Sequence, residues 1–178
     1  MIRWALRLTV IGYAIGWAVD RWLRSQVDGG DVPPIESLVV IDTPIERVWA
    51  TLADIERQPE WMVDMKAVEL LTPGPVGVGT RGTSTVRILG IAVKDPITVT
   101  EFEPPTRFAV RHEGTFTGSG TFTLEPGADG TTTIVRWVEV LRAPVLPNLA
   151  ARLDLPVLAT VFQADLERLR DRIESNPA

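Results

Sequence analysis

Hydrophobic residues recur with helical spacing in one short segment of the first third of the chain. Between residues 43 and 52 the apolar positions fall at i, i+3, i+4 and i+7, which predicts a helix that buries one face. Thr43 and Glu46 have the spacing of a capping box at the start of this helix. Asp54 is placed to cap a second short helix, which Pro59 limits. The apolar positions of the first helix are Ile45, Val48, Trp49 and Leu52.

Most of the remaining chain alternates between apolar and polar residues with the two-residue period of β-strands. Glycine, proline and aspartate interrupt this pattern at regular intervals. Short connections between successive runs favour an antiparallel meander. Pro96 lies inside one run and indicates a bulge or an edge position there. The predicted strands are residues 36–42, 67–72, 79–89, 91–103, 106–113, 115–125 and 131–141.

The last segment returns to helical spacing. Apolar residues recur at steps of three and four from Leu158 to Ile173, with charged residues between them, which predicts a long amphipathic helix. Pro156 marks where this helix starts or kinks. We therefore expect an α+β fold. A curved antiparallel sheet of about six to seven strands wraps around the long C-terminal helix, with two small helices after the first strand.

The first twenty-six residues form a segment of different character. Residues 8–19 are an uncharged run, and Trp4 and Trp22 lie about 27 Å apart along a helix at about 1.5 Å per residue, like an aromatic belt. We expect residues 1–26 to be a hydrophobic helix that anchors the chain in a membrane. We expect the domain that follows it to lie on the cytoplasmic side. The alternatives are a cleaved signal peptide and a soluble helix that is packed on the domain or used for dimer contact.

The expected domain division follows from this interpretation. Residues 27–35 are rich in glycine and proline and are predicted to be a linker, and residues 36–175 are predicted to be the folded domain. Gly12 and Gly16 have the GxxxG spacing that lets two helices approach closely, which would allow a homodimer.

Composition and charge exclude several classes of function. The chain has 178 residues and a net charge of −5, and it contains no cysteine and one histidine. Nucleic acid is not expected as a partner, because phosphate contacts need clusters of lysine and arginine. Without cysteine there is no disulfide or thiolate chemistry, and one histidine cannot build a zinc site of several histidines. We expect no metal and no cofactor.

Four segments together resemble the START-related helix-grip superfamily (SRPBCC), in particular its polyketide cyclase/dehydrase and lipid-transport branch. They are IDTPIERVWATLADIERQPEWM, ITVTEFEPPTRFAV, GSGTFTLEPGADGTTTIVRWVEV and ATVFQADLERLRDRIE. The resemblance implies a deep, mostly apolar cavity between the concave sheet and the long helix, where members commonly hold lipids or other hydrophobic small molecules. It implies no fixed set of catalytic residues, because members range from carriers to cyclases.

Strand alternation identifies the candidate site residues. His112 shares a face of its strand with Phe108 and Val110. If this apolar face is the concave one, His112 points into the cavity. On the last strand either Arg136 or Glu139 faces inward, and Glu101 is a weaker candidate. The predicted cavity residues are Trp61, Val86, Ile88, Phe108, Val110, His112, Gly118, Gly120, Phe122, Leu158 and Phe162.

These residues favour the binding or transport of a hydrophobic small molecule of lipid, polyketide or isoprenoid type, at a membrane. The first alternative is a cyclase or dehydratase acting on a polyketide-like substrate, in which His112 with Glu139 or Arg136 moves protons. The second alternative is an adaptor whose groove binds a hydrophobic peptide or a partner helix.

Overall fold

A seven-stranded sheet and one long helix make up the body of the protein in the computed structural model, which describes residues 2–26, 32–88 and 91–176. All neighbouring strands are antiparallel, in the order β1-β7-β6-β5-β4-β3-β2. The elements are α1 (Ile2–Arg24), β1 (Ile35–Ile41), α2 (Ile45–Leu52), the 3₁₀ helix η2 (Ile55–Glu60), β2 (Met65–Leu70), β3 (Arg81–Ile88), β4 (Ile91–Glu103), β5 (Arg107–Glu113), β6 (Thr117–Pro126), β7 (Thr133–Arg142) and α3 (Pro147–Glu174).

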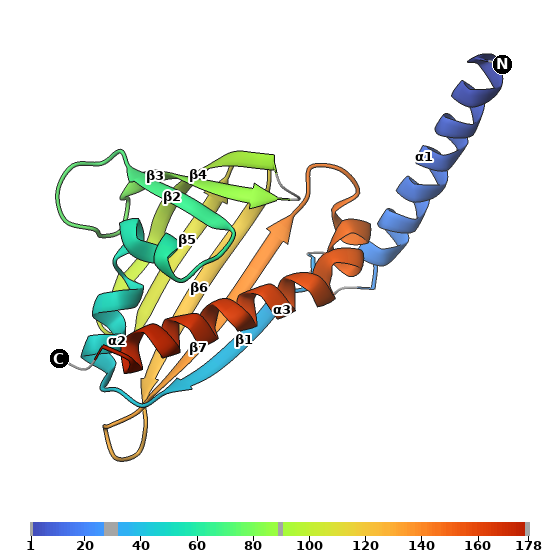
Figure 1. Cartoon of the computed structure of the whole chain (residues 1–178). Helices are drawn as coiled ribbons and strands as arrows, with labels where there is room; N and C mark the ends of the chain where they lie inside the picture. Colours follow the sequence, from blue (N-terminus) through green and yellow to red (C-terminus); the bar gives the residue numbers. More distant parts are fainter. Residues whose placement is uncertain (1, 27–31, 89–90, 177–178) are drawn as a thin grey trace.

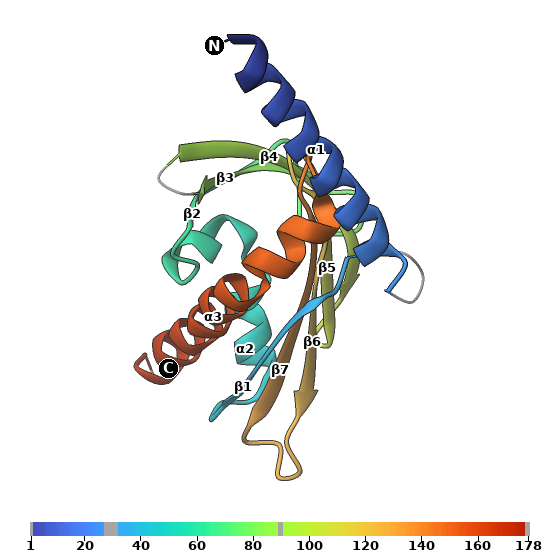
Figure 2. The same cartoon turned by 90° about the vertical axis from the view of Figure 1, so that its right-hand side faces the viewer.

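The sheet curves around α3, which runs along its concave side (Figures 1 and 2). The helices α2 and η2 lie on the same side of the sheet, beside the C-terminal half of α3. Strands β2 to β7 follow one another as a meander, and β1 returns to pair with β7 at the edge. The predicted α+β helix-grip architecture is thus confirmed, including the two small helices after the first strand.

The core lies between α2, the concave face of the sheet and the C-terminal half of α3. The apolar face predicted for α2 is buried at all four positions. Trp49 meets Phe102 edge-on at a ring distance of 5.4 Å, and Trp61 meets Phe122 at 6.3 Å. On α3 the helical spacing buries Leu166, Leu169 and Ile173 against the same cluster.

The start of α2 differs from the predicted capping box. Pro44 is the residue before the helix, and no side chain caps it. Thr43 is instead used within the loop: its hydroxyl donates to the carbonyl of Asp42 at 2.6 Å, and its own carbonyl accepts from Thr133 at 2.7 Å. Because the backbone of Pro44 is extended, the helix begins at Ile45, one residue later than expected. Thr43 is therefore too far from the first turn to cap it.

Two proline predictions also need correction. Strand β4 is one continuous strand in which Pro96 pairs in register with Thr83, so it carries no bulge at the proline. The register shift lies between Val99 and Glu101. Of the two roles predicted for Pro156, that of a helix start is wrong, because α3 begins at Pro147 and contains Pro156 in its interior.

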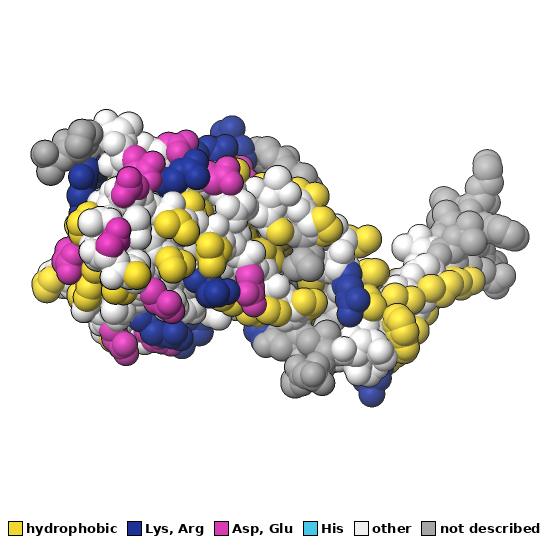
Figure 3. Space-filling model, turned by 90° about the horizontal axis from the view of Figure 1, so that it is seen from below, with side chains coloured by type: hydrophobic (Ala, Val, Ile, Leu, Met, Phe, Trp, Pro, Cys, Tyr) yellow, Lys and Arg dark blue, Asp and Glu magenta, His cyan; other side chains and the backbone are white. Residues whose placement is uncertain are grey.

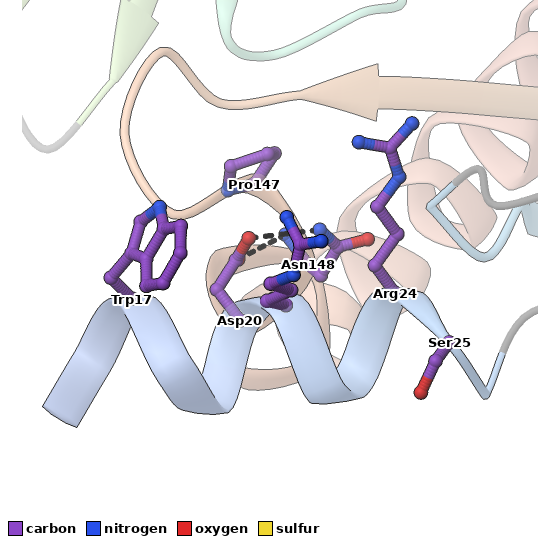
Figure 4. A pocket seen from close by; sticks show the side chains of 7 residues that line it. Trp17, Asp20, Arg24, Ser25, Pro147 and Asn148 are labelled. Atoms are coloured by element: carbon purple, nitrogen blue, oxygen red, sulfur yellow. Dashed lines mark hydrogen bonds between the residues drawn. The ribbon is translucent and has the colours of Figure 1, made fainter. Parts of the chain in front are cut away.

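Helix α1 is attached to the body at the beginning of α3. The Asp20 carboxylate accepts from the backbone N–H of Asn148 at 2.8 Å and from the Asn148 amide at 3.0 Å (Figure 4). It also accepts from the backbone N–H of Leu149 at 2.9 Å. Helix α3 has no side-chain cap from its own N-terminal residue. Asp20 supplies this cap from another helix, and its charge fits the positive end of the α3 dipole.

The remainder of α1 extends away from the body and carries many exposed apolar side chains (Figures 1 and 3). Among the described parts of the chain, no helix is long and apolar enough to cross a membrane. The membrane anchor expected in residues 1–26 is therefore not supported. Its uncharged run is short, and the Asp20 carboxylate accepts hydrogen bonds from the beginning of α3. The exposed apolar residues are Val10, Ile11, Tyr13, Ile15, Trp17, Val19 and Trp22.

The glycine pair of α1 does not support the expected homodimer. A side chain at Gly16 would lie 3.1 Å from the side chain of Leu146, at the beginning of α3. Gly16 therefore faces a contact within the chain, while a side chain at Gly12 would meet no atom within 4 Å of its Cβ. Of the predicted linker, residues 27–31 lie outside the described residues.

Candidate functional site

The inner face of the sheet carries one charged cluster among apolar residues. Strand register places His112 on β5 opposite Ile97 of β4 and opposite Gly118 of β6. On the other side of β6, Gly120 lies opposite Glu139 of β7. His112 and Glu139 therefore stand on two strands that are separated by the glycine-containing stretch of β6.

His112 contacts a carboxylate on each side of its ring. Its Nδ1 donates to Oδ2 of Asp95, on β4, at 2.7 Å. Its Nε2 lies 3.1 Å from Oε1 of Glu139. The three side chains are largely buried, with exposed fractions of 17% for His112, 12% for Asp95 and 5% for Glu139. They form a charged row across four strands that faces the interior.

Both carboxylates are held by further donors. The second oxygen of Asp95 accepts from the backbone N–H of Gly114 at 3.0 Å. Oε2 of Glu139 accepts from the indole Nε1 of Trp137 at 2.9 Å. Oε1 of Glu139, in contrast, is buried and has no hydrogen-bond partner among the described residues. At 3.1 Å its contact with Nε2 is close enough for an ion pair, but it lies off the hydrogen-bond direction.

The glycines around the cluster make room for it. A Cβ at Gly120 would lie 2.4 Å from Oε2 of Glu139, and a Cβ at Gly114 would lie 2.2 Å from Oδ1 of Asp95. At Gly118 the backbone has φ +150°, and a Cβ would lie 1.7 Å from the carbonyl oxygen of Val140. Gly120 thus leaves room for the Glu139 carboxylate, and Gly118 leaves room for the backbone of the neighbouring strand β7.

The environment of His112 favours its charged form. Burial disfavours the imidazolium and by itself lowers the pKa, but the contacts with Asp95 and Glu139 outweigh it and raise the pKa of His112 from 6.5 to about 10. At neutral pH the cluster is therefore an imidazolium between two acidic side chains.

The predicted cavity residues fall into a packed group and a half-buried group. Trp61, Phe108 and Phe122 are almost completely buried in the core. Phe122 stacks between Phe108 at 6.2 Å and Trp137 at 4.9 Å, so side chains fill this part of the concave face. The half-buried residues are Val86, Val110, His112, Gly118, Leu158 and Phe162, while Gly120 is buried and the side chain of Ile88 lies outside the described residues.

The structure also decides between the charged candidates of the last strand. Glu139 lies inside, beside His112. Arg136 lies on the outer face, is exposed, and is 3.4 Å from Glu36. Glu101 is half exposed and pairs with Arg107, away from the cluster. The alternation leaves this choice open because each face of the strand contains one charged residue.

Sequence reasoning missed two members of the site. Asp95 precedes Pro96, and the bulge expected at the proline obscures which face Asp95 occupies. Since the register is regular there, counting back from Ile97 would have placed Asp95 on the inner face. Trp137 looks purely apolar in the strand pattern, although a buried indole N–H needs an acceptor and Glu139 is two residues away on the same face.

Metal binding has no support in the described residues, where no group of three or more histidine, aspartate or glutamate side chains is arranged to hold an ion. Two surface hollows lie elsewhere. One, of about 550 Å³, lies between α1 and α3 beside Trp17 and Asp20 (Figure 4). The other, of about 600 Å³, is lined by polar residues near the end of α3, including Arg47 and Arg172. Neither is lined by His112.

Comparison with known folds gives a consistent result at low sequence identity. The crystal structure of a Thermus thermophilus protein matches with a TM-score of 0.66 and 21% identity, covering 82% of this chain and 100% of that chain. The Zhui aromatase/cyclase from a Streptomyces species matches with a TM-score of 0.65 and 21% identity, covering 80% and 93%. A START superfamily protein from Mycobacterium smegmatis matches with a TM-score of 0.65 and 17% identity, covering 80% and 97%.

These likenesses confirm the START-like fold. No curated protein matches the chain. The model of the family described as polyketide cyclase / dehydrase and lipid transport matches residues 34–174, which include every strand, both small helices and α3. The chain therefore belongs to the polyketide cyclase/dehydrase and lipid-transport family.

Proposed function

We propose that the protein binds a hydrophobic small molecule of lipid, polyketide or isoprenoid type on the inner face of its sheet, beside the cluster of Asp95, His112 and Glu139. The binding unit is the domain of residues 36–175. The observation that carries this proposal is the half-buried apolar surface directly next to the cluster. Val110 lies two residues from His112 on the same face, and Phe162 of α3 contacts the ring of Trp137 at 4.5 Å.

The composition of this surface suits an apolar ligand. Burying apolar surface contributes about 25 cal/mol per Å², so a ligand that covers these side chains gains affinity without acid or base groups. Partial exposure of Val110, Leu158 and Phe162 leaves apolar surface that such a molecule can cover. A single polar cluster in such surroundings fixes the orientation of a ligand.

The state of His112 supports binding over proton transfer. A general base must be neutral before it accepts a proton, and a catalytic pKa works best near the working pH. With its pKa raised to about 10, His112 is charged at neutral pH and acts as a fixed positive group. In this charged form it pairs with the two carboxylates and cannot accept a further proton.

A cyclase or dehydratase is the second candidate, and one observation favours it. The chain's single histidine stands between two carboxylates on the inner face, an arrangement found where acid and base groups are tuned for catalysis. In this case His112 in its charged form would donate a proton to an oxygen of the substrate, and Glu139 would accept one.

Binding is tested with the neutral fluorescent probe N-phenyl-1-naphthylamine added to the full chain. We expect saturable binding that the substitution Val110→Trp weakens by about tenfold or more, because the larger side chain occupies the inner surface. Val40→Trp is the matched control, since Val40 is 50% exposed on the outer face of β1. It should change the affinity by no more than about twofold.

Two results would contradict the proposal. One is the absence of saturable binding to the wild-type protein. The other is an equal affinity of the Val110→Trp and wild-type proteins, provided that circular dichroism shows both to be folded. The second candidate is distinguished by turnover: an enzyme converts its substrate, and His112→Gln abolishes conversion while the variant still binds the probe.

A further inference from the structure

Glu139 presents a buried oxygen whose hydrogen-bonding capacity is unused. The residue is only 4% exposed, and Oε2 is occupied by the indole of Trp137. Oε1 accepts no hydrogen bond from the described residues. The ion pair with His112 compensates the charge of Glu139, but a buried acceptor that receives no hydrogen bond still costs free energy, which a donor on a ligand would recover.

A donor lies directly beside this acceptor. In the protonated ring of His112, Nδ1–H is used by Asp95 at 2.7 Å. Nε2 lies 3.1 Å from Oε1, but its N–H makes no hydrogen bond to that oxygen. The inner face therefore presents one donor and one acceptor, side by side, each with capacity for a further hydrogen bond.

Only some chemical groups match such a pair. An ether or ketone oxygen accepts but does not donate, and an ammonium group donates but does not accept. A carboxylate accepts only and would be repelled by Glu139. A hydroxyl both donates and accepts through one atom, so it can bridge a donor and an acceptor that stand next to each other.

A second polar atom on the same face is also without a partner. Ser37 of β1 lies opposite Trp137 in the sheet, and its hydroxyl is buried with no hydrogen bond among the described residues. Trp137 and Glu139 are two residues apart on one face, so Ser37 belongs to the surroundings of the cluster. A ligand with oxygen substituents satisfies more of these atoms than a pure hydrocarbon.

We propose that the ligand carries an alcohol or phenol hydroxyl, which accepts from Nε2–H of His112 and donates to Oε1 of Glu139. This inference rests on the proposed binding of a hydrophobic molecule and adds its chemical class. The hydrocarbon part covers the half-buried side chains of Val110 and Phe162.

The experiment compares two probes that differ in a single methyl group. The full chain is titrated at pH 7 with 2-naphthol and with 2-methoxynaphthalene by calorimetry. We expect 2-naphthol to bind about tenfold more tightly or better, because a hydrogen bond to a charged group is worth more than one between neutral groups. The single histidine allows a direct readout: ¹⁵N NMR of the ring should show the Nε2 signal of His112 moving when 2-naphthol binds.

The variant Glu139→Gln tests the acceptor. The amide keeps an oxygen for the Trp137 indole and presents NH₂ where the carboxylate had its second oxygen, so the preference for 2-naphthol over 2-methoxynaphthalene should disappear. Glu36→Gln, on the exposed outer face of β1, is the matched control and should keep the preference. If Glu139→Gln fails to fold, the two probes and the NMR signal of the wild-type protein still decide.

The outcomes separate the two proposals. If neither probe binds, the proposed function fails and this inference fails with it. If both probes bind equally and the Nε2 signal does not move, the inference of a hydroxyl ligand is wrong while the binding of a hydrophobic molecule stands. A preference for 2-naphthol that survives in Glu139→Gln would also overturn the inference.

Discussion

The charge of His112 leads to a strong prediction for the pH dependence of stability. The folded protein holds the imidazolium between Asp95 and Glu139, and these contacts raise the pKa of His112 from 6.5 to about 10 despite its burial. In the unfolded chain the histidine loses a proton near its ordinary value. Between these two values the folded protein binds one proton more than the unfolded protein.

The sign and size of the effect follow from this difference. Because the pKa is higher in the folded state, the stabilisation is complete below about pH 6.5 and is lost as the pH rises toward 10. The shift from 6.5 to about 10 corresponds to about 5 kcal/mol in total, or about 1.4 kcal/mol per pH unit at most. This is a large part of the roughly 5 to 15 kcal/mol that typically stabilises a domain.

Two measurements on the full chain test this prediction. Ring NMR of the single histidine gives its pKa in the folded state, and urea unfolding at intervals from pH 6 to pH 9.5 gives the free energy of unfolding. The variant Asp95→Asn removes one negative charge while leaving an oxygen for Nδ1–H. It should lower the pKa of His112 and flatten the pH dependence. A ring pKa at or below about 7 in the wild-type protein, or a stability that stays constant from pH 7 to 9.5, would refute the reasoning.

Three further substitutions test the packing around the site and the attachment of α1. Gly120→Ala should destabilise the protein by about 1–3 kcal/mol, because its Cβ would lie 2.4 Å from the Glu139 carboxylate. Gly12→Ala is the control, because a Cβ there meets open space. Equal effects of the two substitutions would contradict this explanation. Trp137→Phe should cost about 1–3 kcal/mol in urea unfolding by removing the donor to Oε2, and a neutral effect would show that the indole hydrogen bond is unimportant. Asp20→Ala should cost about 1 kcal/mol and speed hydrogen exchange at the N–H groups of residues 148 and 149, whereas unchanged exchange would argue against the cap.

The fold could be predicted from the sequence because its elements are encoded locally. The two-residue alternation defines the strands, and the apolar face of α2 follows from the spacing of four residues that are all buried. Errors arise where a residue has two possible roles. Thr43 has the chemistry of a helix cap, but the neighbouring strand end gives it other partners, Asp42 and Thr133. Asp20 borders the uncharged run as a membrane-segment flank would, yet its partners are 128 and 129 residues away in the sequence.

The candidate site was predictable only in part. His112 could be placed on the inner face from Phe108 and Val110, because alternation along one strand is a local property. Its two carboxylate partners come from other strands, so finding them requires the register of the whole sheet. The glycines of β6 stand out in the sequence, but their purpose depends on Glu139, which reaches across from β7.

The central claim is that a hydrophobic molecule occupies the inner face, and native mass spectrometry of the full chain tests it most directly. The protein is purified without detergent, incubated with the organic extract of the cells that produced it, and measured again. We expect a complex with one hydrophobic molecule per chain that is lost in Val110→Trp and retained in Val40→Trp. A chain that stays without any bound molecule, both as purified and after incubation, would show that the inner face is not a binding site.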